Sequence, residues 1–252
     1  MRKSRISQGP WTRIRPLQRD EVDPYTAAEM IRADHLWSAG VPFNLGKVMA
    51  YLPRFMQTDV DYENSFIFDP PSYRGGVQET GFNDRAIKEL AVLSVAILCR
   101  ARFLLLHHSL IYLEAAEGAD AHAKLLHLHA HEDHSGLYTA RERTVLGYTA
   151  KLIEDAHLMS DGDFADLRET LRAHDMTDAR LAALPAAALD RHVDAQIVEL
   201  TLLVTHFCHL ARWSTVLQIP LEGPKDEYDF LADYAARVPA DVRERNEAVL
   251  AG

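Results

Sequence analysis

Cysteine is scarce in this chain of 252 residues, which carries thiols only at Cys99 and Cys208. Two thiols this far apart do not predict a disulfide framework. Long apolar runs are missing too, because the best stretch, residues 90–113, is interrupted by Arg100, Arg102 and two histidines. A membrane-spanning helix needs about 18–20 uninterrupted apolar residues. We therefore predict a cytoplasmic protein without a membrane partner.

The chain has fewer positive than negative side chains, and its formal net charge is −10 at pH 7. Neutralising a phosphate backbone takes a surplus of lysine and arginine, so the composition argues against a nucleic-acid partner. The first residues lack the apolar segment of a secretory signal. Hydrophobic residues make up 48% of the chain, enough for a sizeable core. The length is typical of one large domain with an extension.

Period-two alternation, the pattern of a half-buried strand, is absent between the turn signals, so we predict an all-α protein. Asn83 or Asp84 is a plausible N-cap for the strongest helix, and Thr139 with Glu142 has the spacing of a capping box. Pro220 should stop the last long helix. Helices are expected over residues 25–39, 45–68 with a break near Pro53, 84–117, 139–159, 160–176 and 188–219. We divide the chain into an N-terminal arm and extension (1–82), a helical domain (83–222) and a tail (223–252).

Four segments, in this order, resemble the carboxymuconolactone decarboxylase and alkyl hydroperoxide reductase D-like family. They are RAIKELAVLSVAIL (85–98), FLLLHHSLIYLEAAEGA (103–119), YTARERTVLGYTAKL (138–152) and IVELTLLVTHFCHLARWSTVLQIPLE (197–222). The resemblance implies an all-α fold built on a helical hairpin. It also implies a homo-oligomer, because such a hairpin exposes an apolar face that a symmetric copy can cover.

Peroxidase members of that family carry a C-x-x-C motif, a histidine four residues after the second cysteine and a glutamate twelve residues before the first. In this chain the cysteine positions hold Ala101 and Leu104, whereas Glu89 and His108 match the two other residues. Thiol peroxidase chemistry needs a thiolate and a resolving partner. We therefore predict that the chain is not a thiol peroxidase.

The retained polar residues predict acid–base chemistry. Glu89 has apolar neighbours on its helix, and burial there should raise its pKa toward the range of a general acid or base. His108 exchanges protons near neutral pH. If the helices pack as the resemblance implies, Glu89 and His108 share one pocket, in which Arg102 holds a substrate anion. We assign catalysis to Glu89 and His108. Substrate binding is assigned to Arg102, Phe103, His107, His206 and Cys208, and no metal or cofactor is predicted.

The leading hypothesis is a cofactor-independent carbon–carbon lyase, decarboxylase-like or retro-aldol, that acts on a small organic acid or an oxygenated aromatic compound. The alternative interpretation of each residue is structural. Glu89 then pairs with Arg85 or Arg102, and His107 is a core histidine. Two other functions remain open: a catalytically silent ligand-binding or scaffold relative, and a metal-dependent enzyme. The latter would use the histidines of segment 122–134, namely His122, His127, His129, His131 and His134.

Overall fold

The computed structural model describes residues 13–38, 41–67, 81–116 and 118–251. Residues 1–12, 39–40 and 68–80 of the predicted N-terminal arm and extension lie outside these ranges. Within them all regular structure is helical, which confirms the all-α prediction. The α-helices are α1 (Pro24–Ser38), α2 (Asn44–Met49), α3 (Pro53–Asn64), α4 (Arg85–Leu98), α5 (Arg102–Ala115), α6 (Ala121–His127), α7 (Ala140–Glu154), α8 (Asp161–Asp175), α9 (Ala179–Ala182), α10 (Ala186–Leu217), α11 (Phe230–Arg237) and α12 (Ala240–Ala251). Among the described residues, none of these helices is long and apolar enough to cross a membrane.

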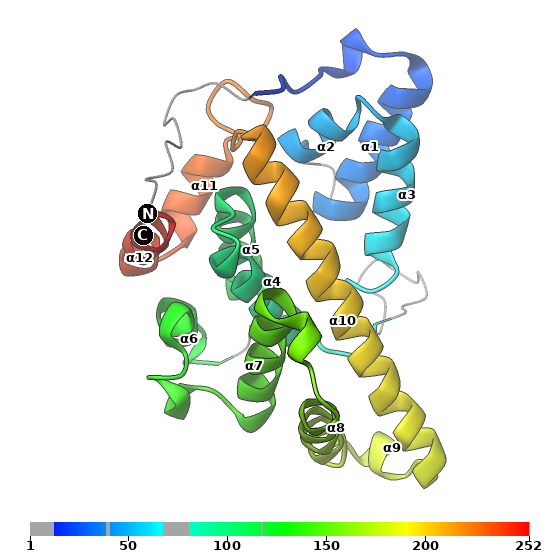
Figure 1. Cartoon of the computed structure of the whole chain (residues 1–252). Coiled ribbons are helices and arrows are strands. Elements are labelled where there is room, and N and C mark those ends of the chain that lie inside the picture. Colours follow the sequence, from blue (N-terminus) through cyan, green and yellow to red (C-terminus); the bar gives the residue numbers. More distant parts are fainter. Residues whose placement is uncertain (1–12, 39–40, 68–80, 117, 252) are drawn as a thin grey trace.

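Helix α4 is the centre of the fold. It packs against α5, α7 and the long helix α10, which crosses the molecule diagonally (Figure 1). Every residue from Ile87 to Ala96 is buried. A helix that is apolar almost all round must be covered on all sides, and this explains why its sequence shows no polar stripe. The few polar side chains on α4 therefore need partners inside the protein.

A tight turn at residues 99–101 divides the single helix expected over 84–117 into α4 and α5, which form the hairpin that the resemblance implied. Arg100 adopts a left-handed conformation with φ of 52°, and the Ala101 amide donates to the Ala96 carbonyl at 2.8 Å. This backbone bond spans five residues, as in a helix C-terminus closed by a left-handed residue. The turn fixes the position of α5 relative to α4.

Helices α1, α2 and α3 pack on one another at one end of the molecule, and α11 and α12 contact α5 (Figure 1). Both predicted capping residues of the central helices are confirmed. The Asp84 side chain accepts from the Ile87 amide, and Thr139 forms its capping box with Glu142. Helix α10 ends at Leu217, just before Pro220.

Candidate active site

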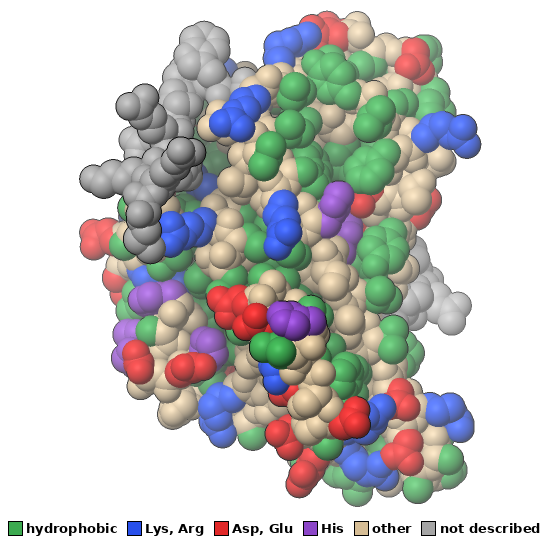
Figure 2. All heavy atoms as spheres, in the orientation of Figure 1, with side chains coloured by type: hydrophobic (Ala, Val, Ile, Leu, Met, Phe, Trp, Pro, Cys, Tyr) green, Lys and Arg blue, Asp and Glu red, His purple; other side chains and the backbone are tan. Residues whose placement is uncertain are grey.

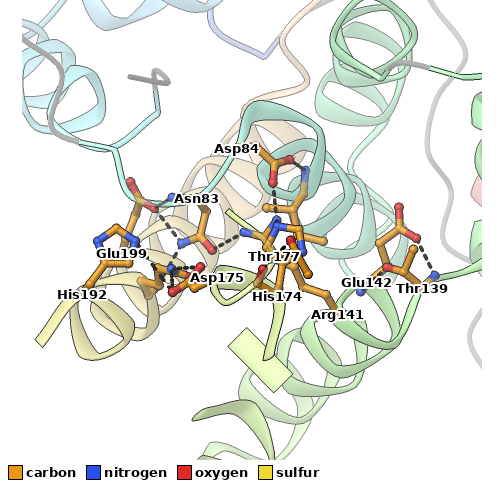
Figure 3. A network of polar contacts seen from close by, with 12 residues as sticks. Asn83, Asp84, Thr139, Arg141, Glu142, His174, Asp175, Thr177, His192 and Glu199 are labelled. Atoms are coloured by element: carbon orange, nitrogen blue, oxygen red, sulfur yellow. Dashed lines mark hydrogen bonds and ion pairs between the residues drawn. The ribbon is translucent and has the colours of Figure 1, made fainter. Parts of the chain in front are cut away.

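A buried polar network holds the start of α4 (Figure 3). Glu199 of α10 accepts hydrogen bonds from the Phe82 and Asn83 amides at 2.9 and 2.7 Å, and Lys88 Nζ lies 3.2 Å from it. Arg141 of α7 contacts both Asp84 and Asn83. Because these contacts fix the first turn of α4, they also fix the side chains that project from its second turn.

Glu89 of α4 and His108 of α5 lie in direct contact. His108 Nδ1 is 2.7 Å from Glu89 Oε2, and Glu89 is fully buried. Arg85, one turn before Glu89, places its Nε 2.7 Å from the other carboxylate oxygen. This ion pair is close, yet Oε1 has no well-aligned hydrogen bond among the described residues. The two residues assigned to catalysis are therefore brought together, and Glu89 also pairs with Arg85 as the structural interpretation expected.

The charge state of Glu89 differs from the expectation. Burial alone raises its pKa, but the positive charges of Arg85 and His108 outweigh this effect and lower it below the ordinary value of 4.5. The prediction of a raised pKa is therefore wrong. Glu89 is a carboxylate at neutral pH that accepts the Nδ1–H of His108, which leaves Nε2 as the histidine nitrogen free for proton exchange.

His108 and Arg85 line the same small cavity, which has a volume of about 60 Å³. Apolar side chains from α2, α5 and α10 close most of the wall. The lining residues are Phe43, Leu45, Glu63, Ile67, Arg85, Phe103, Leu104, His107, His108, Ile111, Phe207 and Leu210. Of the predicted substrate-binding residues, Phe103 and His107 belong to this wall.

Both ring nitrogens of His107 have a polar partner. Nδ1 lies 2.8 Å from the Phe103 carbonyl oxygen, and Nε2 lies 3.0 Å from Glu222 Oε2. The ring is stacked between Phe103 and Phe230, with centroid distances of 4.2 and 3.8 Å. A carbonyl oxygen only accepts, so Nδ1 donates to it. His107 thus behaves as the core histidine of the structural interpretation, although its ring also forms part of the cavity wall.

Arg102 does not lie where the sequence predicted. It is the first residue of α5, its side chain is half exposed, and it pairs with Glu247 of α12 at 2.7 Å. It neither lines the cavity nor contacts Glu89. The arginine that does both is Arg85, which the sequence analysis considered only as a structural partner. The i, i+4 spacing of Arg85 and Glu89 was the signal that pointed to it.

His206 and Cys208 of α10 are also outside the cavity wall. His206 is buried against α3, with Nε2 3.3 Å from Glu63 Oε2. Cys208 Sγ lies 4.0 Å from Cys99 Sγ, so the two distant thiols are neighbours in space. Burial, followed by the nearby Cys208, raises the pKa of the Cys99 thiol to about 11. At neutral pH this thiol is protonated and a poor nucleophile.

The histidines of segment 122–134 do not gather into a metal site. His122 pairs with Asp241 at 2.9 Å, and His131 Nδ1 lies 3.2 Å from the Leu128 carbonyl oxygen. His127 and His134 stack with ring centroids 3.8 Å apart. In the described part of the chain, no group of three potential ligand atoms forms there. The geometry therefore does not favour the metal enzyme that this segment suggested.

A second and larger cavity of about 670 Å³ lies between the start of the described chain, α2, α3 and the end of α10. Figure 2 shows hydrophobic side chains gathered over the upper part of this face, where these elements lie. Its size is within the range of roughly 300–1,000 Å³ that is usual for small-molecule sites. The wall is formed by Arg13, Ile14, Arg15, Val48, Met49, Tyr51, Leu52, Phe55, His209, Trp213 and Leu217.

Comparison with known proteins supports the fold. No family model matches the sequence, and no curated protein has a detectably similar one. A solved structure described as an alkylhydroperoxidase AhpD core, an uncharacterized peroxidase-related protein from Ralstonia eutropha JMP134, superposes with a TM-score of 0.58 at 14% identity. The match covers 85% of this chain and 94% of the other. The two chains share a fold. At 14% identity this similarity supports the predicted helical architecture. It does not assign a reaction to this chain.

Proposed function

We propose that the chain is a carbon–carbon lyase of the decarboxylase type that acts on a short organic acid. The observation that carries the proposal is the contact between Glu89 and His108, with His108 and Arg85 on one cavity wall. Arg85 supplies the positive charge that attracts a substrate carboxylate. It takes the role that the sequence assigned to Arg102.

The proton transfer is assigned to Nε2 of His108. When the carboxylate leaves as CO₂, the electron pair of the broken bond remains on the substrate carbon, and the His108 imidazolium donates a proton to that carbon. Water then returns a proton to the imidazole. Glu89 is a positioning residue, because it fixes the His108 tautomer and stabilises the imidazolium without reaching the cavity. The apolar wall keeps bulk water away from the carbanion.

The cavity is small, with a volume of about 60 Å³, so a short acid needs less displacement of its wall than an oxygenated aromatic compound does. We therefore favour a small organic acid over an oxygenated aromatic compound as the substrate. Loss of CO₂ is fast only when an electron-withdrawing group stabilises the carbanion, so short β-keto acids are the first compounds to test.

The test is CO₂ release from a panel of short β-keto acids such as acetoacetate and oxaloacetate. We expect His108→Ala to lower kcat by about 100-fold or more, the usual contribution of a general acid. Glu89→Gln should lower kcat and shift its pH profile, because the imidazolium loses its carboxylate. His157→Ala is the matched control, since this histidine is exposed. Turnover that survives unchanged in His108→Ala would refute the assignment.

A second candidate function, ligand binding without catalysis, is favoured by the larger apolar cavity. Its 670 Å³ volume and the exposed aromatic residues Tyr51 and Phe55 suit an apolar small molecule. The test is titration with the apolar dye anilinonaphthalene sulfonate. Leu52→Asp, at a highly exposed lining position, should weaken binding, whereas Leu158→Asp, at an equally exposed position outside the cavity, should not. Equal dye binding in both variants would contradict this candidate.

A further inference from the structure

A cluster of two carboxylates and one imidazole lies beside the small cavity. Asp59 and Glu63 are one turn apart on α3, and His206 projects toward them from α10. His206 Nε2 is 3.3 Å from Glu63 Oε2, and His206 Nδ1 is 3.9 Å from Asp59 Oδ1. One potential ligand atom from each residue falls within 4.8 Å of the other two.

The cluster is buried and its charges do not balance. The exposed fractions of Asp59, Glu63 and His206 are 7%, 8% and 5%. Even with His206 protonated, two carboxylates leave one negative charge in excess. Among the described residues no lysine or arginine forms an ion pair with either carboxylate.

Asp59 shows the consequence of this imbalance. Its Oδ2 atom is buried without a hydrogen-bond partner among the described residues. An unpaired buried carboxylate oxygen is costly. The ring edges of Tyr62, Phe66 and Phe207 surround the His206 ring, so the surroundings supply little polar compensation.

We propose that Asp59, Glu63 and His206 bind a divalent transition-metal ion, with Zn²⁺ as the best fit. Carboxylate oxygen and imidazole nitrogen are both zinc ligands, and bond lengths of about 2.1 Å place tetrahedral ligand atoms about 3.4 Å apart. The separation of 3.3 Å between Glu63 Oε2 and His206 Nε2 matches this value. The 3.9 Å contact of Asp59 Oδ1 is with the other ring nitrogen, but one ligand atom from each residue still lies within 4.8 Å of the other two, so a small shift of the Asp59 side chain completes the site. A +2 ion cancels the two carboxylate charges, and ligation through Oδ2 gives this orphaned Asp59 oxygen a partner.

The donor set separates zinc from the hard cations. Mg²⁺ and Ca²⁺ prefer six or more oxygen ligands, so an imidazole and two carboxylates in a dry pocket disfavour them. Three protein ligands leave at least one coordination position of zinc open, as in catalytic zinc sites. Glu63 also belongs to the wall of the cavity that His108 lines, so the ion is placed next to that cavity. The binding itself does not depend on the proposed lyase activity.

The experiment uses the full chain, stripped with a chelator and titrated with ZnCl₂ by calorimetry, followed by elemental analysis after gel filtration. We expect one zinc ion per chain and a rise in Tm, and no response to MgCl₂. Asp59→Asn and Glu63→Gln should each weaken binding by at least about 10-fold. Cobalt(II) should give the absorption spectrum of a tetrahedral site in the wild type and lose it in Asp59→Asn.

Matched controls separate this site from other zinc-binding surfaces. Asp61→Asn changes an exposed carboxylate of the same helix, and His127→Ala changes the histidine segment 122–134, which lies outside the cluster; both should bind zinc like the wild type. Circular dichroism of each metal-free variant establishes that it is folded. Asp59→Asn should be at least as stable as the metal-free wild type, because it removes an uncompensated buried charge. Substoichiometric zinc, equal affinity in Asp59→Asn, or a loss of binding caused by His127→Ala would each overturn the proposal.

Discussion

The substitution Glu89→Gln tests the central electrostatic contact of the fold. It keeps the shape of the side chain and removes a fully buried negative charge that faces Arg85 and His108. Removing one partner of a buried ion pair costs about 3–5 kcal/mol. Here the lower end applies, because Arg85 keeps the Ile67 carbonyl as an acceptor at 2.9 Å and its side chain is 21% exposed. Neutral His108 still donates its Nδ1–H to the amide oxygen.

We therefore expect a loss of about 3 kcal/mol in the free energy of unfolding at neutral pH. For a chain of this length, 1 kcal/mol corresponds to about 2–4 °C, so Tm should fall by roughly 6–12 °C. The measurement is urea unfolding followed by circular dichroism. Glu114→Gln is the control, because this carboxylate is half exposed in its pair with Arg237 and should change stability by less than about 1 kcal/mol.

The lowered pKa of Glu89 also predicts how the stability difference between wild type and variant changes with pH. Because the folded-state pKa of Glu89 is lowered, its stabilising contribution is complete above the unfolded value of 4.5 and is lost as the pH falls through the folded-state pKa. Glutamine does not titrate, so the stability difference between wild type and variant should shrink as the pH falls below about 4.5. A difference under about 0.5 kcal/mol at neutral pH, or one that grows below about pH 4.5, would contradict the reasoning.

Three further outcomes follow from the described contacts. Arg102→Ala should change the free energy of unfolding by less than about 1 kcal/mol and leave CO₂ release unchanged, because its pair with Glu247 is exposed; a large loss of activity would restore Arg102 to the site. Lys88→Ala should cost about 3–5 kcal/mol in urea unfolding, since it leaves the buried Glu199 without its ammonium partner, whereas Lys225→Ala, at an exposed position, should have little effect. The reduced protein should consume hydroperoxide no faster than its Cys99→Ser variant in a peroxide-depletion assay, because the raised pKa of Cys99 leaves little thiolate; rapid stoichiometric consumption by the wild type would refute this.

The hairpin and the Glu89–His108 pair were accessible from the sequence through the family resemblance, whose motif matches both residues. Helix periodicity alone predicted one continuous helix over 84–117, because the turn that separates α4 from α5 has no glycine or proline to mark it. The position of Arg102 was not accessible in this way. It is the first residue of α5, where the direction of a side chain depends on how the preceding turn is closed. The left-handed conformation of Arg100 carries no sequence signature, since such positions usually hold glycine.

The direction of the Glu89 pKa shift could be determined only from the distances between its carboxylate and the neighbouring charged groups. Burial and neighbouring charge act in opposite directions, and the sequence revealed only the apolar neighbours. The same limit applies to Glu63, which is 143 residues from His206, and to Glu222, which is 115 residues from His107. No pattern with the period of a helix joins such residues, so their contacts become visible only in the folded chain.

The long-range contacts of Glu222 affect the order in which the molecule folds. Its carboxylate accepts from the Asn44 amide at 2.6 Å and contacts His107 at 3.0 Å, so it closes loops of 178 and 115 residues. Loop closure of this length is entropically unfavourable until the intervening helices have docked, whereas the α4–α5 hairpin closes locally. We therefore expect the cavity wall at His107 to form late in folding. A nascent chain that has not yet emerged beyond residue 222 lacks the Glu222 carboxylate that holds this part of the wall.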